Sequence, residues 1–240
     1  MEASLYVATA TQRNIEKQLV VVANNIANSN TVGFRAESID FNSLISTTAK
    51  DPVHFPVVAG MRASYEQGAL VETGNPYDVA ISGDGWFAIT TPAGTAYTRD
   101  GRLEVNPFGE LQTLEGFPVL DSGEAPIQLD PSAGVPTIHP DGRIEQNGSQ
   151  VASLGLFEIT KENMTGRYTN TSFFTNVPAT PIAPGTDTTI TQRYVESSNV
   201  NAVKEMAHLM TITQAFESAT ALIGRADDTL SKSINELGGG

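Results

Sequence analysis

Hydrophobic residues recur at alternating spacings of three and four at both ends of the chain. Such spacing places apolar side chains on one face of a helix and is typical of coiled coils. At the first end the series consists of Leu5, Ala8, Gln12, Ile15, Leu19, Val22 and Ile26. We predict a helix from Ser4, as its N-cap, to about Asn28. Val20, Val21 and Ala23 lie beside this series, so the helix should pack against more than one neighbour.

The last part of the chain carries a longer series of the same kind. Its members are Ala202, Met206, Leu209, Thr213, Phe216, Thr220, Ile223, Asp227, Leu230, Ile234 and Leu237. They predict a helix over residues 202–237, about 54 Å long at 1.5 Å per residue, with Asn199 or Asn201 as its N-cap. Three of the positions are polar, which disfavours a simple two-stranded pairing and favours a more crowded packing.

Proline and glycine mark the middle of the chain as rich in turns. All 13 prolines lie between Pro52 and Pro184, and 16 of the 21 glycines lie between Gly60 and Gly185. The segments Asp-Val-Ala-Ile at 78–81 and Trp-Phe-Ala-Ile at 86–89 flank Ser-Gly-Asp-Gly at 82–85, which predicts two strands joined by a turn. We expect a compact, mainly antiparallel β-domain.

Two short sequences in this region share the pattern Asp-Gly-Arg-(Leu/Ile)-Glu. They begin at Asp100 and at Asp141. Asp-Gly between alternating residues favours a tight hairpin, because both central residues tolerate positive φ. Asn147-Gly148 predicts a further turn before a strand over residues 151–159.

Asparagines crowd the end of the first predicted helix, where residues 24–30 contain four of them. Asparagine competes for backbone hydrogen bonds and favours helix ends and turns, and the following Gly33 can adopt positive φ. Phe34 can then pack on the far side of the turn. Residues 36–67 have a weak pattern, and we expect a mobile, partly extended connector there.

These patterns together predict an α+β protein in which long terminal helices flank a β-domain. The expected parts are residues 1–35 (the N-terminal helix and Asn-rich turn), 36–67 (the connector), 68–184 (the β-domain) and 185–240 (a linker and the C-terminal helix).

The charge disfavours nucleic acid and anionic membranes as partners. The chain has 27 acidic and 14 basic residues, a net charge of −13. Division at Gly68 and Pro181 gives −1, −9 and −3, so the middle part is the most negative. A phosphate-rich surface would be repelled. No apolar run near the start is long enough for a membrane span or a signal-peptide core, so we expect no membrane insertion, and any export from the cytoplasm would occur without a cleaved signal peptide.

Catalytic and metal-binding patterns do not emerge from the sequence. His54, His139 and His208 lie in three separate regions, and cysteine is absent, so no metal site is expected. Asp100 and Asp141 could form an acid–base pair, but both begin predicted turns. Gly83-Asp84-Gly85 lacks the rest of a dinucleotide-binding loop, and Ser82 lacks the sequence of a nucleophile elbow. We expect neither enzyme activity nor a cofactor.

Several motifs resemble the flagellar basal-body rod and hook family. The quoted segments lie at residues 5–8, 18–19, 23–34, 67–70, 73–75, 78–87, 97–101, 196–201, 205–206 and 216–217. They occur in order over both ends and much of the middle. The short chain and the sequence Ser-Asn-Val-Asn-Ala-Val at 198–203 favour a proximal over a distal rod subunit. Residues 9–11 and 214–216 depart from the usual family pattern.

The resemblance implies a non-enzymatic axial subunit of the bacterial flagellum. Such proteins leave the cell through the flagellar export apparatus and assemble with other rod proteins and copies of themselves into the periplasmic rod of the basal body, which transmits torque. Their terminal helices form the inner layer and the β-domain the outer one. The residues expected to contribute to assembly are Leu5, Ile15, Leu19, Val22, Asn24, Asn25, Ile26, Asn28, Asn30, Thr31, Gly33, Phe34, Ser198, Asn199, Val200, Met206, Leu209, Phe216, Ile223, Leu230 and Ile234.

Three alternatives remain open from the sequence. One is a distal rod or hook subunit of the same family. Another is a secreted adhesive protein whose β-domain binds a ligand through Trp86, Phe87 and Tyr97, although these aromatic residues more readily pack within strands. The third is an enzyme that uses Asp100 or Asp141.

Overall fold

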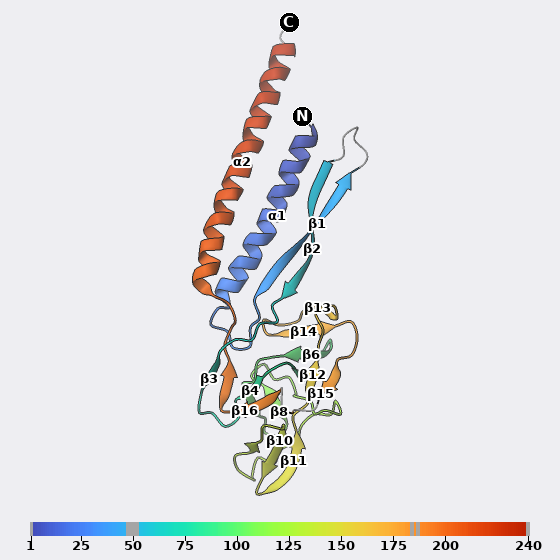
Figure 1. The fold of residues 1–240 in the computed structure, drawn as a ribbon, viewed down its shortest axis with the longest axis vertical. Coiled ribbons are helices and arrows are strands. Elements are labelled where there is room, and N and C mark those ends of the chain that lie inside the picture. The colour runs from blue at the N-terminus through green and yellow to red at the C-terminus, as the bar shows by residue number, and fades with distance from the viewer. Residues whose placement is uncertain (1, 47–52, 183–184, 186–187, 239–240) are drawn as a thin grey trace. The chain divides into compact units, whose positions relative to one another are not determined.

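The computed structural model describes residues 2–46, 53–182, 185 and 188–238. Two long helices and a mainly antiparallel β region confirm the predicted α+β class (Figure 1). The chain divides into two compact units. The helical unit contains Met1–Ala27, Ala36–Ser64 and Val200–Gly240, and the β-unit contains Asn28–Arg35 and Tyr65–Asn199.

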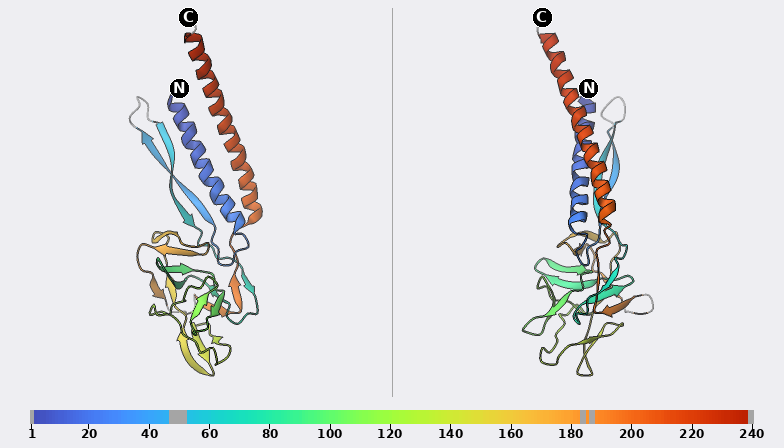
Figure 2. Two further views of the ribbon diagram at one scale, coloured as in Figure 1. Left: turned by 180° about the vertical axis from the view of Figure 1, so that it is seen from behind. Right: turned by 90° about the vertical axis from the view of Figure 1, so that its left-hand side faces the viewer.

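The helical unit consists of two helices and one hairpin. Its elements are α1 (Glu2–Ala27), β1 (Glu37–Ser46), β2 (Val53–Ala63) and α2 (Ala202–Gly238). The helix α1 lies between α2 and the hairpin (Figure 1; Figure 2, left). Its two neighbours explain its two apolar faces, because Val22 is buried towards α2 and Val21 beside the hairpin residue Ile39.

The seam between the helices differs by one position from the predicted series on α2. Ile15, Val22 and Ile212 are buried in it, with Leu19, Ile26, Leu209, Phe216 and Ala219 packed around them. The seam of α2 therefore passes through Ile212 and Ala219, whereas Thr213 and Thr220 are exposed. Each of these threonines donates its hydroxyl to the carbonyl four residues earlier, so neither interrupts the apolar contact.

The predicted N-cap of α2 is confirmed, whereas the predicted N-cap of α1 is wrong. Asn201 caps α2, because its Oδ1 accepts a hydrogen bond of 3.0 Å from the amide of Lys204. Helix α1 begins at Glu2, so Ser4 lies within the helix and does not cap it.

The expected connector contains a regular antiparallel pair. Strand β1 pairs with β2 from Glu37 opposite Ala63 to Ser46 opposite Val53, with a register shift after Asp40. The mixed polar and apolar sequence hid these strands, because a bulge interrupts their alternation of side chains. Residues 47–52, part of the same expected connector, lie outside the described residues.

Within the described residues the β-unit contains fifteen short strands. They are β3 (Leu70–Glu72), β4 (Val79–Ser82), β5 (Phe87–Thr91), β6 (Gly94–Thr98), β7 (Leu103–Val105), β8 (Leu111–Thr113), β9 (Thr137–Ile138), β10 (Arg143–Gln146), β11 (Ser149–Ser153), β12 (Leu156–Glu158), β13 (Met164–Arg167), β14 (Ser172–Thr175), β15 (Thr180–Ile182), β16 (Thr189–Gln192) and β17 (Tyr194–Glu196). The largest sheet has the order β13-β14-β6-β5.

The first and last strands of the β-unit pair with each other. Strand β17 pairs with β3 and β16 pairs with β4, both antiparallel. The chain therefore enters and leaves this unit along neighbouring strands. A core of buried aliphatic and aromatic residues lies beneath them and includes Ile81, Phe87, Leu111 and Ile144.

The two Asp-Gly-Arg-(Leu/Ile)-Glu sequences adopt different structures. Asp141-Gly142 closes the hairpin of β9 and β10, as predicted, although only Gly142 has positive φ. Asn147-Gly148 closes the next hairpin with positive φ at both residues, also as predicted. Asp100-Gly101 was wrongly predicted to form a hairpin, since β6 pairs with β5 and β14, and β7 pairs with β8.

Gly101 serves a different purpose from a hairpin glycine. Its carbonyl accepts a hydrogen bond of 2.9 Å from the amide of Val79. A Cβ at this position would overlap the carbonyl oxygen of Val79. The carboxylate of Asp100 meanwhile binds the guanidinium of Arg102 at 2.6 Å and accepts its amide at 3.1 Å. Glycine is therefore required here for close backbone approach.

Candidate functional site

The Asn-rich stretch contributes to both units, and Asn25 is its main contribution to the helical unit. Its carboxamide accepts a hydrogen bond from the amide of Glu37 and donates one to the carbonyl of the same residue, both at 2.9 Å. The side chain thus imitates a paired strand residue at the start of β1. Its Nδ2 also lies 3.4 Å from Oε2 of Glu205, in the first turn of α2.

Asn25 therefore joins all three elements of the helical unit, because it belongs to α1 and contacts both β1 and α2. It is 2 % exposed. Neighbouring Asn24 donates to the carboxylate of Glu37 at 3.3 Å. Only a carboxamide combines an acceptor and a donor at the required positions, which explains asparagine here. Asparagine was predicted to favour the end of the first helix, and there Asn25 satisfies the backbone groups of a strand.

Residues 28–35 form a tight turn in the β-unit. The carbonyl of Asn28 accepts from the amide of Thr31, whose hydroxyl donates to Oδ1 of Asn28, both at 3.1 Å. Gly33 has the positive φ that we predicted, +70°, and its amide donates to the carbonyl of Glu196 at 2.7 Å. A Cβ on Gly33 would overlap the backbone of Asp100. This position demands glycine for both its φ and its surroundings.

Phe34 and Arg35 end this turn inside the β-unit. The ring of Phe34 is fully buried, and the guanidinium of Arg167 lies 4.5 Å from its centroid. Arg167 also donates to the carbonyl of Arg35 at 2.8 Å. The side chain of Arg35 donates to the carbonyls of Tyr65 and Glu66. Phe34 therefore packs as predicted, and Arg35 ties the turn to the segment that re-enters the unit.

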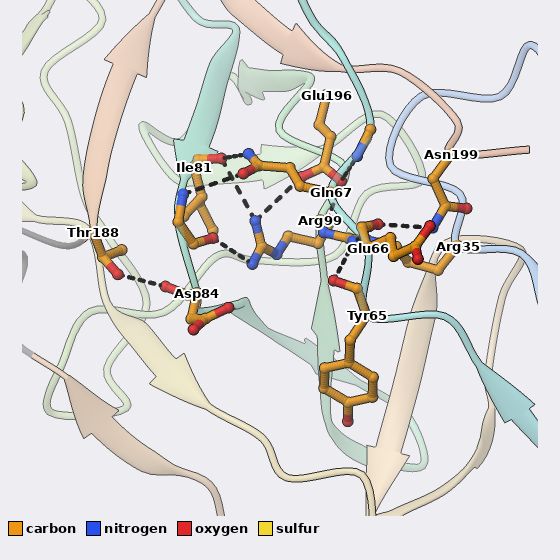
Figure 3. Close-up of polar contacts among 12 residues, drawn as sticks. Arg35, Tyr65, Glu66, Gln67, Ile81, Asp84, Arg99, Thr188, Glu196 and Asn199 are labelled. Carbon is orange, nitrogen blue, oxygen red and sulfur yellow. Dashed lines mark hydrogen bonds and ion pairs between the residues drawn. The ribbon is translucent and has the colours of Figure 1, made fainter.

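A buried ion cluster of Glu196, Arg35 and Arg99 lies at the centre of these contacts (Figure 3). The Oε1 atom of Glu196 is 2.7 Å from Nη2 of Arg35, and its Oε2 is 3.1 Å from Nη1 of Arg99. All three side chains are at most 4 % exposed. Oε1 also accepts the amide of Gly68 at 3.1 Å. We call these three residues the Glu196 cluster.

Trp86 lies against both arginines of the cluster. The guanidinium carbons of Arg35 and Arg99 are 5.7 and 5.4 Å from its ring centroid, a distance at which cation–π attraction operates. Burial lowers the pKa of Arg35 and lowers that of Arg99 to about 10, against the opposing effect of the Glu196 carboxylate. Arginine side chains stay protonated in proteins, so one carboxylate serves two charged guanidinium groups.

Five sequence motifs meet at this cluster although they are far apart in the chain. Gln67 accepts the amide of Gly83 at 3.3 Å, and Arg99 donates to the carbonyl of Gly83 at 2.8 Å. Asn199 donates to the carbonyl of Glu66 at 2.7 Å (Figure 3). The contributing segments are residues 33–35, 66–68, 81–86, 97–101 and 196–199.

The structure brings together only some of the residues predicted to contribute to assembly. Ile15, Leu19, Val22, Ile26, Leu209 and Phe216 form the helix seam, and Ile223 is half-buried. Met206 is 48 % exposed and lies outside the seam. Asn28, Gly33, Phe34, Ser198 and Asn199 lie in the β-unit, together with half-buried Thr31 and exposed Asn30.

The remaining residues that we predicted to contribute to assembly lie in the helical unit. Asn24, Asn25 and half-buried Val200 belong to the helical unit. Leu5 lies in α1 and Leu230 and Ile234 lie in α2, but their side chains are outside what the structure describes. Whether each of these residues contributes to assembly stays a prediction.

Sequence reasoning missed the ionic residues at the centre of the site. Arg35, Arg99 and Glu196 each lie within or directly after a motif that we quoted, yet none was proposed as a site residue. Charged residues inside otherwise apolar and amide-rich motifs were the available signal. The motifs contain two such arginines and one glutamate, which could have suggested that one carboxylate pairs with both guanidinium groups.

No arrangement within the described residues resembles a catalytic or metal site. No group of three or more histidine, aspartate or glutamate side chains is placed to hold a metal there. Asp100 and Asp141 are bound by Arg102 and Arg143, so both have structural partners. A cleft of about 190 Å³ beside Trp86 is lined by residues of both charges, including Asp84, Glu158 and Lys161.

The aromatic residues considered for ligand binding are not available at the surface. Trp86, Phe87 and Tyr97 are at most 3 % exposed. Neither helix combines the length and apolar character that a bilayer span requires, as far as the described residues extend.

Comparison with known proteins identifies matches to three family models. Residues 5–35 match the flagella basal body rod protein model, residues 80–146 the D1 domain of the flagellar hook protein FlgE/F/G, and residues 191–237 the C-terminal model of the flagellar basal body rod FlgEFG protein. These matches include the Asn-rich turn, Trp86, Arg99, Glu196 and most of both helices.

Individual relatives match over the whole chain. The flagellar basal-body rod protein FlgF of Rhizobium meliloti (strain 1021) is 45% identical over 100% of this chain and 99% of its own length. The FlgF protein of Mesorhizobium japonicum is 44% identical over 99% of both chains. The basal-body rod protein FlgG of Agrobacterium fabrum is 32% identical over 92% of this chain and 93% of its own length. The chain therefore belongs to the flagellar hook and basal-body rod family.

Proposed function

We propose that this chain is a structural axial subunit of the proximal rod of the flagellar basal body. The observation that carries the proposal is the 45% identity to a rod protein FlgF over the full length of both chains. The FlgG protein of Agrobacterium fabrum is less similar, at 32% identity, and this difference favours the proximal over the distal rod. The family is structural, and the chain is not an enzyme.

The geometry of the chain supports this function. An axial subunit of a helical assembly needs two different surfaces that contact its neighbours, because contacts that do not close generate an open array. Two paired helices leave long outer faces for such contacts. Within the β-unit the Glu196 cluster holds residues 33–35 and 196–199 by buried ion pairs, and within the helical unit Asn25 holds the end of α1, as suits a subunit that carries load.

Its partners are other rod proteins and copies of the same chain. The chain reaches the periplasmic part of the basal body through the flagellar export apparatus, without removal of a signal peptide. The absence of cysteine suits a structural protein outside the cytoplasm, because no disulfide or free thiol needs control there.

Localisation within isolated basal bodies tests this function. A strain lacking the gene should not swim, and an epitope-tagged copy should restore swimming. The tag should be detected by electron microscopy on the rod, on the side nearer the inner membrane. Normal swimming without the gene would contradict the proposal, and label on the distal rod or hook would favour the related alternative. Label on the cell surface would favour an adhesive function.

A further inference from the structure

Each helix of the pair has an outer face that points away from the seam. On α1, Val20 lies five residues after the seam residue Ile15, which places it about 140° from the seam at 100° per residue. On α2, Met210 lies two residues before Ile212 and about 160° from the seam. Val20 is 65 % exposed and Met210 is 68 % exposed. Neither side chain is used by the packing within one copy.

The two outer faces have complementary side chains. We define the outer face of α1 by Arg13, Lys17, Val20 and Ala27, and the outer face of α2 by Val203, Met206, Met210 and Glu217; all eight residues are exposed. On the first face, the basic residues Arg13 and Lys17 precede the apolar Val20 and Ala27. On the second face, three apolar residues precede the acidic Glu217, so in the antiparallel pair the charged parts of the two faces lie toward the same end. Large exposed apolar residues at i, i+3 and i+7 on α2 suit contact with another helix.

Residues of the two outer faces also lie at matching positions along the axes of the two helices. Asn25 contacts Glu205, so residues 25 and 205 lie at the same level of the antiparallel pair. Both helices rise about 1.5 Å per residue, so equal steps from this contact reach equal heights. Val20 is therefore level with Met210, Arg13 with Glu217, and Ala27 with Val203. Glu16, the other exposed charge on this part of α1, is level with the uncharged Gln214.

We propose that the outer face of α2 in one copy packs against the outer face of α1 in a second copy at the same height. This inference rests on the proposed function as an axial subunit and names the contact that would connect neighbouring copies. Val20 meets Met210, and Arg13 meets Glu217. Because the two faces differ, each copy contacts one neighbour through α1 and another through α2, and the contact is repeated from copy to copy.

Disulfide trapping tests this contact, since the chain has no cysteine of its own. A variant with both Val20→Cys and Met210→Cys is expressed in place of the native chain, and isolated basal bodies are oxidised. Disulfides form where Cα atoms lie about 4.4–6.8 Å apart. Within one copy each position points about 140–160° away from the seam on its own helix, so we expect only contacts between copies to join them. We expect a reducible series of dimers and larger multimers.

A matched variant combines Val20→Cys with Thr211→Cys. Thr211 is exposed and adjacent to Met210, but it points about 100° away from it. This variant should give no multimers. If both variants are incorporated and give the same bands, the proposed contact is wrong although the proposed function stands. If even the unmodified chain is absent from basal bodies, the proposed function itself fails.

A charge exchange provides a second, independent measurement. Arg13→Glu and Glu217→Arg each place like charges together, and each should lower incorporation into basal bodies by at least about twofold. The two substitutions in one chain restore opposite charges in every contact and should recover incorporation. A combined variant that is no better than the single ones would overturn the proposal, even where the cysteine variants fail to assemble.

Discussion

At the scale of single residues, Glu196 is the group on which the site depends most. Its carboxylate is shared between Arg35 and Arg99, and its carbonyl accepts the amide of Gly33. It therefore fixes both the turn after α1 and the segment that leads to α2. Ionic groups this deeply buried are stable only together, because each loses its hydration and needs the others as partners.

We predict that Glu196→Gln strongly destabilises the β-unit. Two guanidinium groups would stay buried without a counter-charge, which should lower the free energy of unfolding by about 3 kcal/mol. Urea denaturation followed by tryptophan fluorescence measures this, because Trp86 lies against both arginines. As a control, Glu104→Gln at an exposed position should change stability by less than about 0.5 kcal/mol. Equal effects of the two substitutions would show that the cluster contributes little.

Asn25→Asp tests whether the carboxamide joins α1 to β1. A carboxylate can still accept the amide of Glu37 but cannot donate to its carbonyl, and it faces the carboxylate of Glu205. We expect a loss of about 2 kcal/mol in unfolding free energy. The loss should shrink when the pH falls low enough to protonate the introduced group. Asn30→Asp, at an exposed position, should have little effect; a comparable loss there would point to added charge as the cause.

Gly33→Ala separates local strain from steric overlap when it is compared with Gly74→Ala. The two glycines have φ values of +70° and +74°, but a Cβ has open space only at Gly74. We expect a loss of about 1 kcal/mol at Gly74. At Gly33 the loss should reach about 3 kcal/mol, because the backbone of Asp100 must also move. Similar melting temperatures for both variants would contradict a close approach at Gly33.

At the scale of elements, the helices and several turns were predictable because their signals are local. Apolar spacing located α1 and α2, and Asn-Gly located the turn between β10 and β11. Spacing alone does not separate Ile212 from Thr213, and the more apolar Ile212 was the available signal that the predicted series overlooked. The role of Gly101 also escaped, since it depends on Val79, more than twenty residues away.

The helical unit should open more readily than the core of the β-unit. Among the side chains that the structure describes, its seam contains three buried hydrophobic residues, against fifteen in the main core of the β-unit. Isolated helices gain most of their stability from such packing. Amide exchange on the single chain in solution should therefore be faster in α1 and α2 than in β5 and β6. Strong and equal protection in all four elements would contradict this expectation.

At the scale of the whole molecule, the candidate site was predicted as a region but not as a chemical arrangement. The Asn-rich stretch was identified as the place where the first helix ends, and the structure shows Asn25 and Gly33 fixed there by specific partners. Glu37 is the partner of Asn25 in the helical unit, and Glu196 and Arg99 surround Gly33 from distant parts of the sequence. Sequence spacing cannot reveal such contacts, because they arise only when each unit folds.

Ile223→Asp tests whether the helices act in assembly and not in folding of the β-unit. Ile223 is half-buried on α2, beyond the residues that form the buried seam, so a charge there should leave the β-unit folded. We expect circular dichroism and the unfolding transition of that unit to stay native, while incorporation into basal bodies and swimming are lost. Val151→Asp, at an exposed position of β11, should preserve both. Normal swimming with Ile223→Asp would contradict an axial role for α2, because a crowded rod core leaves an unpaired carboxylate without hydration or a counter-charge.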